Sequence, residues 1–287
     1  MEVPQPVSHY ASKIRDPVAL AGCRNSDRGL DCCEYDLIVF SPEAFPPRLD
    51  VVEGYTIEVV QLNRERSMMP ELIDAQMLNT LDLRYDPISP EDRRKRSRKI
   101  LNALGRKSIA KCLMLQKKSQ DAAKNPFVSA AWLKSAAYYY TRGLLQISGS
   151  RPMPAHELEQ LRELGQNRKL AAELDIGFDA IGLGNATRQS ISRVKKAASE
   201  LLAKQYDVEL ILEKTDSLQE KQKLTDAFYY LGRVLCDRLN ENESALLVYP
   251  KIVQVALCMS TDQNEIQKLR SELFRAAAMT LKKQISE

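Results

Sequence analysis

The chain has 287 residues, of which 44% are hydrophobic and 28% are charged, and its net charge at pH 7 is +4. This length suits one large domain or two ordinary ones, and the composition is typical of a water-soluble globular protein. No apolar run approaches the roughly 18 residues that a membrane-spanning helix needs, so we expect no membrane partner. The small positive excess does not by itself indicate nucleic-acid binding.

The six cysteines and two histidines limit the kinds of metal site and catalytic site that the chain can form. Cys32 and Cys33 are adjacent, the other cysteines are scattered, and no Cys-x-x-Cys pair occurs, which argues against a structural zinc site. The N-terminus lacks a basic segment followed by an apolar one, so we expect no secretory signal, reduced cysteines and a cytoplasmic location. Carboxylates and backbone amides would then carry most of any catalysis.

The first 90 residues mix strand and helix patterns. The segment Met68–Leu81 predicts a short helix, whereas Glu43–Gly54, with two adjacent prolines, is expected to be a loop. Thr80–Pro90 alternates apolar and polar residues. Three runs rich in β-forming residues are expected to be strands: Val18–Ala21, Leu37–Phe40 and Tyr55–Leu62. Residues 1–90 are therefore predicted to form a small α/β domain.

From Pro90 onward the patterns are helical. Pro90, followed by the acidic residues Glu91 and Asp92, is typical of a helix start. The segment Phe127–Ile147 is apolar on most faces, as in a buried helix. Breaks fall at 148–156 and near Gly177–Asn185. Two apolar stripes with helical spacing comprise Leu224, Ala227, Phe228, Leu231 and Leu235, then Ile266, Leu269, Leu273, Phe274, Ala277 and Leu281. The prediction is an α+β protein with an all-helical domain over 91–287, which the break near Gly177–Asn185 allows to divide into sub-bundles 91–176 and 186–287.

An acidic pattern stands out in the N-terminal part. Gly22 and Cys23 follow the first expected strand, and Glu34 and Asp36 come ten residues later at the head of the second. Residues i and i+2 of a strand share a face, so Glu34 and Asp36 project together. Glu58 interrupts the apolar run of the third strand. If this strand pairs beside the second, the three carboxylates converge.

Converging carboxylates repel one another unless a cation joins them. Oxygen ligands suit Mg²⁺, and two such ions about 3.5–4 Å apart can hold both oxygens of a phosphoryl displacement. A glycine turn beside the acids lets the backbone approach a phosphate. An acid pair at a strand start is nevertheless a weak signal alone, because a solvated strand end has the same pattern.

In this order and spacing the pattern resembles that of the nucleotidyltransferase superfamily, which includes DNA polymerase β, kanamycin nucleotidyltransferase and the minimal nucleotidyltransferases. The family pattern runs apolar-Gly-Gly/Ser, about ten residues, acid-apolar-acid, and later a third acid between apolar residues. Here it covers Ala21-Gly22-Cys23, Glu34-Tyr35-Asp36-Leu37 and Ile57-Glu58-Val59, and Arg24 and Ser26 are similar to the loop of the minimal family. The resemblance spans roughly residues 8–88 and implies a nucleotidyltransferase-fold mixed sheet.

The resemblance implies a mechanism and roles for named residues. Glu34, Asp36 and Glu58 would ligate two Mg²⁺ ions, with Glu58 also helping to deprotonate the acceptor. The triphosphate of an NTP such as ATP would be held by Gly22, Cys23, Arg24 and Ser26. The implied reaction moves a nucleoside monophosphate to a hydroxyl of a small molecule, a protein or an RNA end.

Two departures from the family pattern leave an alternative open. Cys23 stands where Gly or Ser is usual, and Glu34 stands where Asp is commoner. They favour a catalytically degenerate protein that keeps the fold as a nucleotide-binding, RNA-binding or protein-interaction module. A purely structural helical scaffold is a third interpretation.

Three further patterns have an ordinary structural explanation. The basic segment 91–118 could follow an RNA backbone, but its apolar stripe favours an amphipathic helix with a solvated basic face. Tyr138, Tyr139 and Tyr140 are expected to pack mainly in a core, because three consecutive residues surround most of a helix. The Gly182–Gly184 segment predicts a helix end and linker rather than a dinucleotide loop.

Overall fold

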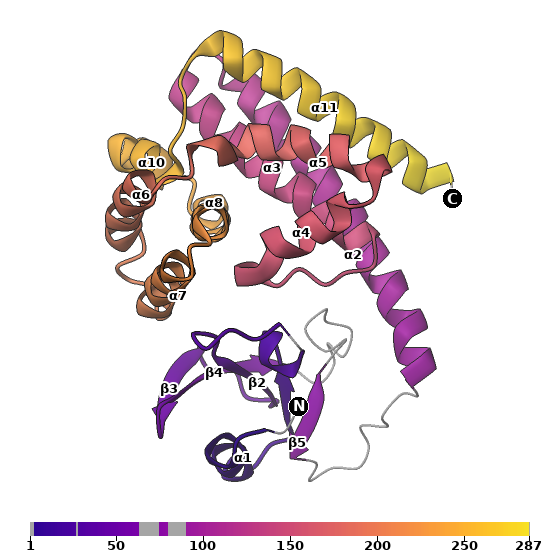
Figure 1. The fold of residues 1–287 in the computed structure, drawn as a ribbon, viewed down its shortest axis with the longest axis vertical. Helices are drawn as coiled ribbons and strands as arrows, with labels where there is room; N and C mark the ends of the chain where they lie inside the picture. Colours follow the sequence, from indigo (N-terminus) through magenta and orange to yellow (C-terminus); the bar gives the residue numbers. More distant parts are fainter. Residues whose placement is uncertain (1–2, 27, 63–74, 80–89, 287) are drawn as a thin grey trace. The chain divides into compact units, whose positions relative to one another are not determined.

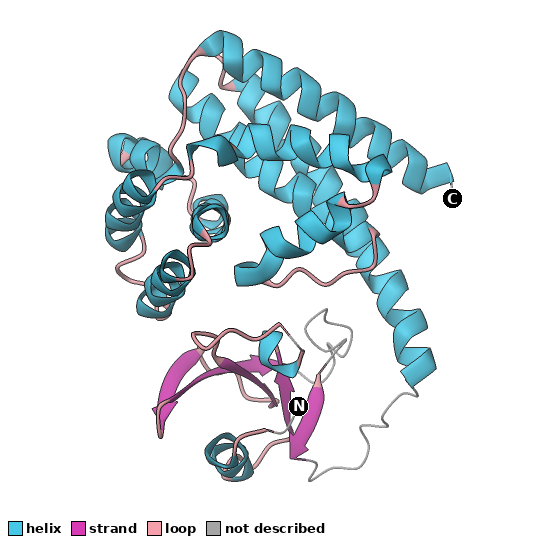
Figure 2. Ribbon diagram, viewed as in Figure 1, coloured by secondary structure: helices cyan, strands magenta, loops and turns pink. Residues whose placement is uncertain are grey.

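The computed structural model describes residues 3–26, 28–62, 75–79 and 90–286 (Figure 1). Backbone contacts divide the chain into two compact units. One comprises Met1–Ile100 together with Gln205–Leu210, and the other comprises Leu101–Lys204 together with Ile211–Glu287. The first contains a five-stranded sheet and the second is helical, so the protein belongs to the α+β class (Figure 2).

The sheet is mixed, with strand order β3-β4-β2-β1-β5. Its central pair, β2 and β4, is parallel, and the other neighbouring pairs are antiparallel. The sheet unit contains a short helix, five strands and one 3-10 turn: α1 (Gln5–Ser12), β1 (Val18–Ala21), η1 (Cys23–Asn25), β2 (Tyr35–Phe40), β3 (Arg48–Val52), β4 (Tyr55–Leu62) and β5 (Gln76–Asn79).

The two faces of the sheet bury different side chains. On one face, Val7 and Ala11 of α1 pack against alternate strand residues such as Leu37 and Val59. The opposite face carries a smaller apolar cluster: Ala19, Ala21, Ile38, Phe40 and Leu62. Because strand side chains alternate, Asp36 lies on this second face with Ile38 and Phe40. The sheet core is thus formed under α1, and the acids lie on the other side.

Tertiary pairing produces three elements that the sequence patterns did not indicate. The predicted helix Met68–Leu81 is wrong over Gln76–Asn79, which forms edge strand β5 against β1. Residues 68–74 lie outside the described part, as do residues 80–89, which hold the end of this helix and the alternating pattern expected from residue 80. The expected loop Glu43–Gly54 contains strand β3, whose pairing with β4 overrides its weak local signal. Helix α1 was also not predicted; it is held by packing of its two buried residues.

The three strands expected from composition are confirmed, as β1, β2 and β4. The helical part is confirmed as well, with these elements: α2 (Pro90–Asp121), α3 (Pro126–Ile147), η4 (Pro154–His156), α4 (Glu157–Gly165), α5 (Arg168–Ile181), η5 (Leu183–Asn185), α6 (Arg188–Leu201), α7 (Val208–Glu220), α8 (Leu224–Glu241), α9 (Ala245–Val248), α10 (Pro250–Leu257) and α11 (Gln263–Ser286).

Helix α3 is the centre of the helical unit, as its apolar sequence predicts. Most of its residues are buried, and it packs against α5, α8 and α11 (Figure 1). It meets α2 where two glycines face each other: a Cβ at Gly105 would lie 2.6 Å from Ile147, and one at Gly143 would lie 2.6 Å from Ile109. The missing side chains allow the two helices to approach closely.

Several predicted helix faces can be compared with the structure. The stripe on α8 is confirmed by the burial of Ala227, Leu231 and Leu235. On α11, Leu273 and Ala277 are buried, but Phe274 is 54% exposed, so the prediction that it belongs to the same apolar stripe is wrong. Phe274 lies one position beyond Leu273, which turns it about 100° away from the packed face.

The break expected at Gly177–Asn185 starts later. Helix α5 continues through Gly177, where the absence of a Cβ leaves room for the Thr141 methyl group. The helix ends at Gly182, whose φ of 77° and ψ of 41° are left-handed, as predicted for a helix end. The tyrosine prediction also holds, because Tyr138 and Tyr140 are buried while Tyr139 is partly exposed.

The helical unit buries charged groups beside partners. Glu157 is fully buried; it forms a 2.8 Å ion pair with Arg233 and accepts a 2.8 Å hydrogen bond from the Tyr229 hydroxyl. Tyr229 also lies 3.0 Å from the Thr141 hydroxyl. Lys134 on α3 donates to the Leu257 carbonyl at the end of α10, and burial lowers the pKa of this lysine to about 8.

Within the described ranges, no helix combines the length and the apolar character needed to cross a membrane. Helix α2 is amphipathic: Leu101, Ile109 and Leu115 are buried, while Arg106 and Lys107 are exposed. This supports the interpretation of a solvated basic face for the described residues from 97 onward; the side chains of 91–96 lie outside the described part.

Candidate acidic site on the sheet

Sheet register brings the acids together. Strand β2 pairs in parallel with β4, which places Asp36 directly opposite Glu58, and it pairs with β1, which places Asp36 opposite Ala21. Glu34 immediately precedes β2. One carboxylate oxygen from each of Glu34, Asp36 and Glu58 lies within 4.8 Å of the other two. The condition set by the sequence, that the third strand pair beside the second, is therefore met.

The surroundings of the three carboxylates differ. Glu34 is only 8% exposed, whereas Asp36 and Glu58 are half-buried. Tyr206, which belongs to the sheet unit by its contacts, donates a hydrogen bond from its hydroxyl to Oε1 of Glu58. This bond fixes one carboxylate oxygen of Glu58 at the edge of the cluster of three acids. Close carboxylates repel one another when ionised, and a proton or a cation between them relieves this repulsion.

Gly22 is required by the position of Asp36. It connects β1 to η1 with φ 73° and ψ −168°, a conformation that residues with a side chain rarely adopt. A Cβ on Gly22 would lie 1.4 Å from Oδ2 of Asp36. The turn and the carboxylate therefore occupy adjoining space that only glycine leaves open.

The other residues expected to bind nucleotide shape the loop itself. Arg24 donates from Nε to the Cys33 carbonyl at 2.9 Å and from Nη2 to the Asp31 carbonyl at 2.8 Å. Its guanidinium also lies 5.0 Å from the centre of the Tyr35 ring. Ser26 donates from its hydroxyl to the Cys23 carbonyl at 2.7 Å. In this arrangement both side chains order the backbone between the turn and β2.

The structure thus gathers Glu34, Asp36, Glu58 and the Gly22 turn, and it directs Arg24 and Ser26 into their own loop. Sequence reasoning did not identify Tyr206 as a neighbour of Glu58, since no sequence pattern links residues 148 positions apart. It also gave no role to Cys33, whose sulfur lies within 4.8 Å of that of Cys23. The acids of β2 and the glycine before them have a recognisable spacing in the sequence. The contacts of Tyr206 with Glu58 and of Cys23 with Cys33 depend instead on the shape of the loops.

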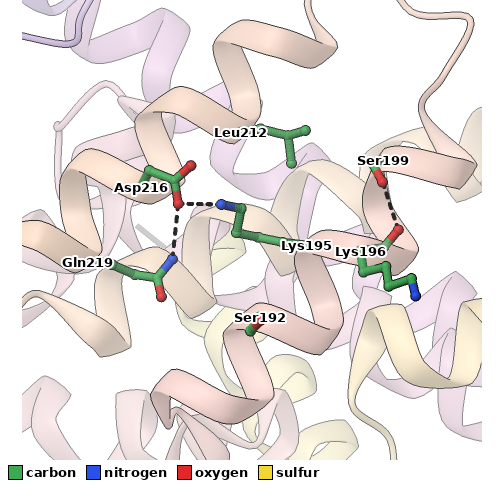
Figure 3. A pocket seen from close by; sticks show the side chains of 7 residues that line it. All are labelled: Ser192, Lys195, Lys196, Ser199, Leu212, Asp216 and Gln219. Carbon is green, nitrogen blue, oxygen red and sulfur yellow. Dashed lines mark hydrogen bonds and ion pairs between the residues drawn. The ribbon is translucent and has the colours of Figure 1, made fainter.

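The helical unit has a polar groove between α6 and α7, with a volume of about 420 Å³ (Figure 3). Lys195 forms an ion pair with Asp216 across it, and Gln219 donates to the same carboxylate at 3.4 Å. Lys196 and Ser199 lie along the α6 side. The opposite charges of Lys195 and Asp216 compensate each other, so the groove has only a weak preference for an anion.

Comparison with protein-family models, with curated proteins and with solved structures found no match for this chain. The fold is therefore described by its own elements, a mixed five-stranded sheet followed by helices.

Proposed function

We propose that the protein is a Mg²⁺-dependent nucleotidyltransferase that moves a nucleoside monophosphate from an NTP to a hydroxyl acceptor. The observation that carries this proposal is the convergence of three carboxylates within 4.8 Å beside a glycine turn that only glycine can form. A group of acids without a specific role would not require a glycine turn beside it. The acceptor is a small molecule, a protein side chain or an RNA end.

The donor set fits Mg²⁺. Three carboxylates on adjoining backbone segments supply oxygen ligands, and Mg²⁺ prefers such ligands with retained waters. Glu34, Asp36 and Glu58 would hold the metal. When bound, two Mg²⁺ ions would neutralise the phosphates and stabilise the attacking and leaving oxygens.

The chain's own residues would divide the remaining tasks. The Gly22 turn lets the backbone approach the triphosphate without a side chain in the way. Arg24 holds the loop in shape through the carbonyls of Asp31 and Cys33. Glu58, oriented by the Tyr206 hydroxyl, would accept the acceptor's proton on its second oxygen.

Metal binding provides the first experiment. At a free Mg²⁺ concentration 100 times its Kd, binding stabilises the folded state by about 2.7 kcal/mol, which raises the melting temperature. Asp36→Asn should lose this shift, whereas the matched control Glu53→Gln, in an exposed turn, should keep it. Equal shifts for wild type and Asp36→Asn would contradict a metal site at these acids.

Turnover is tested with the four NTPs, each labelled in the α-phosphate, in the presence of Mg²⁺. Wild type should release pyrophosphate and transfer label to water, to the protein or to added RNA ends. Asp36→Asn should reduce this rate by at least about 100-fold, because charge stabilisation of the transferring group is lost. Pyrophosphate release that is the same in both proteins would refute the catalytic proposal.

A second candidate is a nucleotide-binding module without turnover. It is favoured by the engagement of Arg24 and Ser26 within their own loop and by the thiol at position 23 in place of a hydroxyl. This candidate predicts a thermal shift with NTP and Mg²⁺ but no pyrophosphate. Restoring the usual hydroxyl with Cys23→Ser would then strengthen NTP binding.

A further inference from the structure

Two thiols lie at the two ends of the loop that joins the glycine turn to β2. Cys23 follows Gly22, Cys33 precedes Glu34, and the two Sγ atoms lie within 4.8 Å of each other. Cys33 is 3% exposed, whereas Cys23 is partly exposed. The loop therefore begins with an accessible thiol and ends with a buried one, within a short distance of each other.

Backbone contacts hold these two positions opposite each other. The antiparallel ladder between β1 and β2 ends at Ala21 and Asp36, directly before and after the loop. Beyond the ladder, Arg24 Nε donates to the Cys33 carbonyl, and the Cys33 amide donates to the Leu30 carbonyl at 2.9 Å. A disulfide needs a sulfur–sulfur distance of about 2.05 Å, so the two sulfurs, which lie within 4.8 Å, must approach each other by less than about 3 Å.

We propose that Cys23 and Cys33 are a redox modification site that forms a reversible disulfide with an oxidised low-molecular-weight thiol, of the glutathione disulfide class, as the oxidant. The Cys23 thiolate attacks the small disulfide, which releases one small thiol and leaves a mixed disulfide on Cys23. The Cys33 thiol gives its proton to solvent and attacks the Cys23 sulfur, which releases the second small thiol. The two cysteines lose two electrons, and the oxidant gains them.

Closing this bond would change the acidic site. Cys33 is covalently next to Glu34, and Cys23 is next to the turn that fits around Asp36. Drawing the sulfurs together moves Glu34 relative to Asp36, so the Mg²⁺ affinity falls. This effect on metal binding rests on the proposed function, whereas formation of the disulfide does not.

The disulfide is tested on the folded full-length protein equilibrated at a series of glutathione disulfide to glutathione ratios. After alkylation of remaining thiols and digestion with trypsin without reductant, mass spectrometry should find peptide Asp16–Arg24 joined to peptide Gly29–Arg48. The joined species should have lost two hydrogen atoms and should disappear on reduction. Its absence at every ratio would overturn the proposal.

The neighbouring Cys32 provides a matched control in the same peptide. Cys32→Ser should keep the cross-link, and both Cys33→Ser and Cys23→Ser should lose it. In urea the preference for Cys33 over Cys32 should vanish, because it depends on the folded loop. A cross-link that survives Cys33→Ser in the folded protein would show that proximity does not select this pair.

Magnesium binding then separates the two proposals. Oxidised Cys32→Ser protein should lose the Mg²⁺-dependent thermal shift, and reduction should restore it. No shift in the reduced protein would refute the metal site while leaving the disulfide result intact. An undiminished shift in the oxidised protein would refute the coupling between the disulfide and the site.

Discussion

The sheet unit and the helical unit place acidic side chains in different surroundings. In the helical unit Glu157 is buried with a specific cation, Arg233, and a specific donor, Tyr229. On the sheet, oxygens of the Glu34, Asp36 and Glu58 carboxylates lie within 4.8 Å of one another, and of these three residues Glu34 is buried. Removing one partner of a buried ion pair leaves a buried charge without compensation, whereas the acids gathered at the strand end are the basis of the proposed Mg²⁺ site. The two units therefore place the same residue type in different surroundings.

The largest expected effect comes from removing the compensated acid. Glu157→Ala should destabilise the fold by about 3–5 kcal/mol, because Arg233 would remain buried without its partner. Urea unfolding followed by circular dichroism measures this loss. Glu159→Ala, two residues along the same helix and 40% exposed, should cost less than about 1 kcal/mol. Similar losses for both variants would break the contrast between the units.

Gly22→Ala tests whether the acidic site depends on its turn. The new methyl group would collide with Asp36 and force a side chain into a positive-φ conformation, so we expect a loss of about 3 kcal/mol and of Mg²⁺ binding. Gly54→Ala, at φ 84° with nothing near its Cβ, should lose only about 1 kcal/mol. Retention of the Mg²⁺-dependent thermal shift in Gly22→Ala would show that Asp36 can move without cost to the site.

Lys134 extends the comparison to a buried cation, whose contribution to the free energy of unfolding depends on pH. Its pKa is lowered by burial to about 8 in the folded protein, from 10.5, so between these values the unfolded chain binds the extra proton. Stability therefore rises with pH in this window, by about 2 kcal/mol between pH 8 and pH 10 for this group alone. The difference in unfolding free energy between wild type and Lys134→Met should grow in favour of wild type by this amount. A difference that does not change with pH would argue against a lowered pKa.

The smallest effect is expected at the rim of the acidic site. Tyr206→Phe removes the hydroxyl that donates to Glu58, a bond worth about 1 kcal/mol. If this bond orients Glu58 for the metal, Mg²⁺ affinity measured by calorimetry should fall about fivefold. Tyr249→Phe, whose ring is exposed on the helical unit, is the control and should change nothing. Unchanged Mg²⁺ affinity in Tyr206→Phe would assign the hydroxyl no positioning role.

Much of this architecture follows from local sequence patterns. Strands β2 and β4 are runs of branched and aromatic residues, α3 is apolar on most faces and α8 has clear apolar periodicity, so local preference and burial agree there. The shared face of Asp36 and Glu34 follows from strand alternation alone. The positive φ of Gly182 likewise follows from the preference for glycine at helix ends.

The errors in strand assignment occur where pairing with a neighbouring strand decides the structure. Gln76–Asn79 became a strand because β1 offered an open edge, and Arg48–Val52 became one because β4 did. Neither segment has a strong preference of its own. The contact of Tyr206 with Glu58 and the proximity of Cys23 and Cys33 depend on the three-dimensional course of the chain, which no sequence spacing encodes.

Strand β3 forms one outer border of the sheet, and its composition has a consequence for self-association. Its backbone groups on that side have no neighbouring strand in the five-stranded order, and Val51 is 74% exposed. Such a border can recruit another chain into an extended sheet. Arg48 and Asp50, joined at 3.0 Å and tied to Tyr10 of α1, place charge on this border. Adding a second copy along this border would require these charged groups to lose water or to rearrange, which lowers the tendency of the border to recruit another strand.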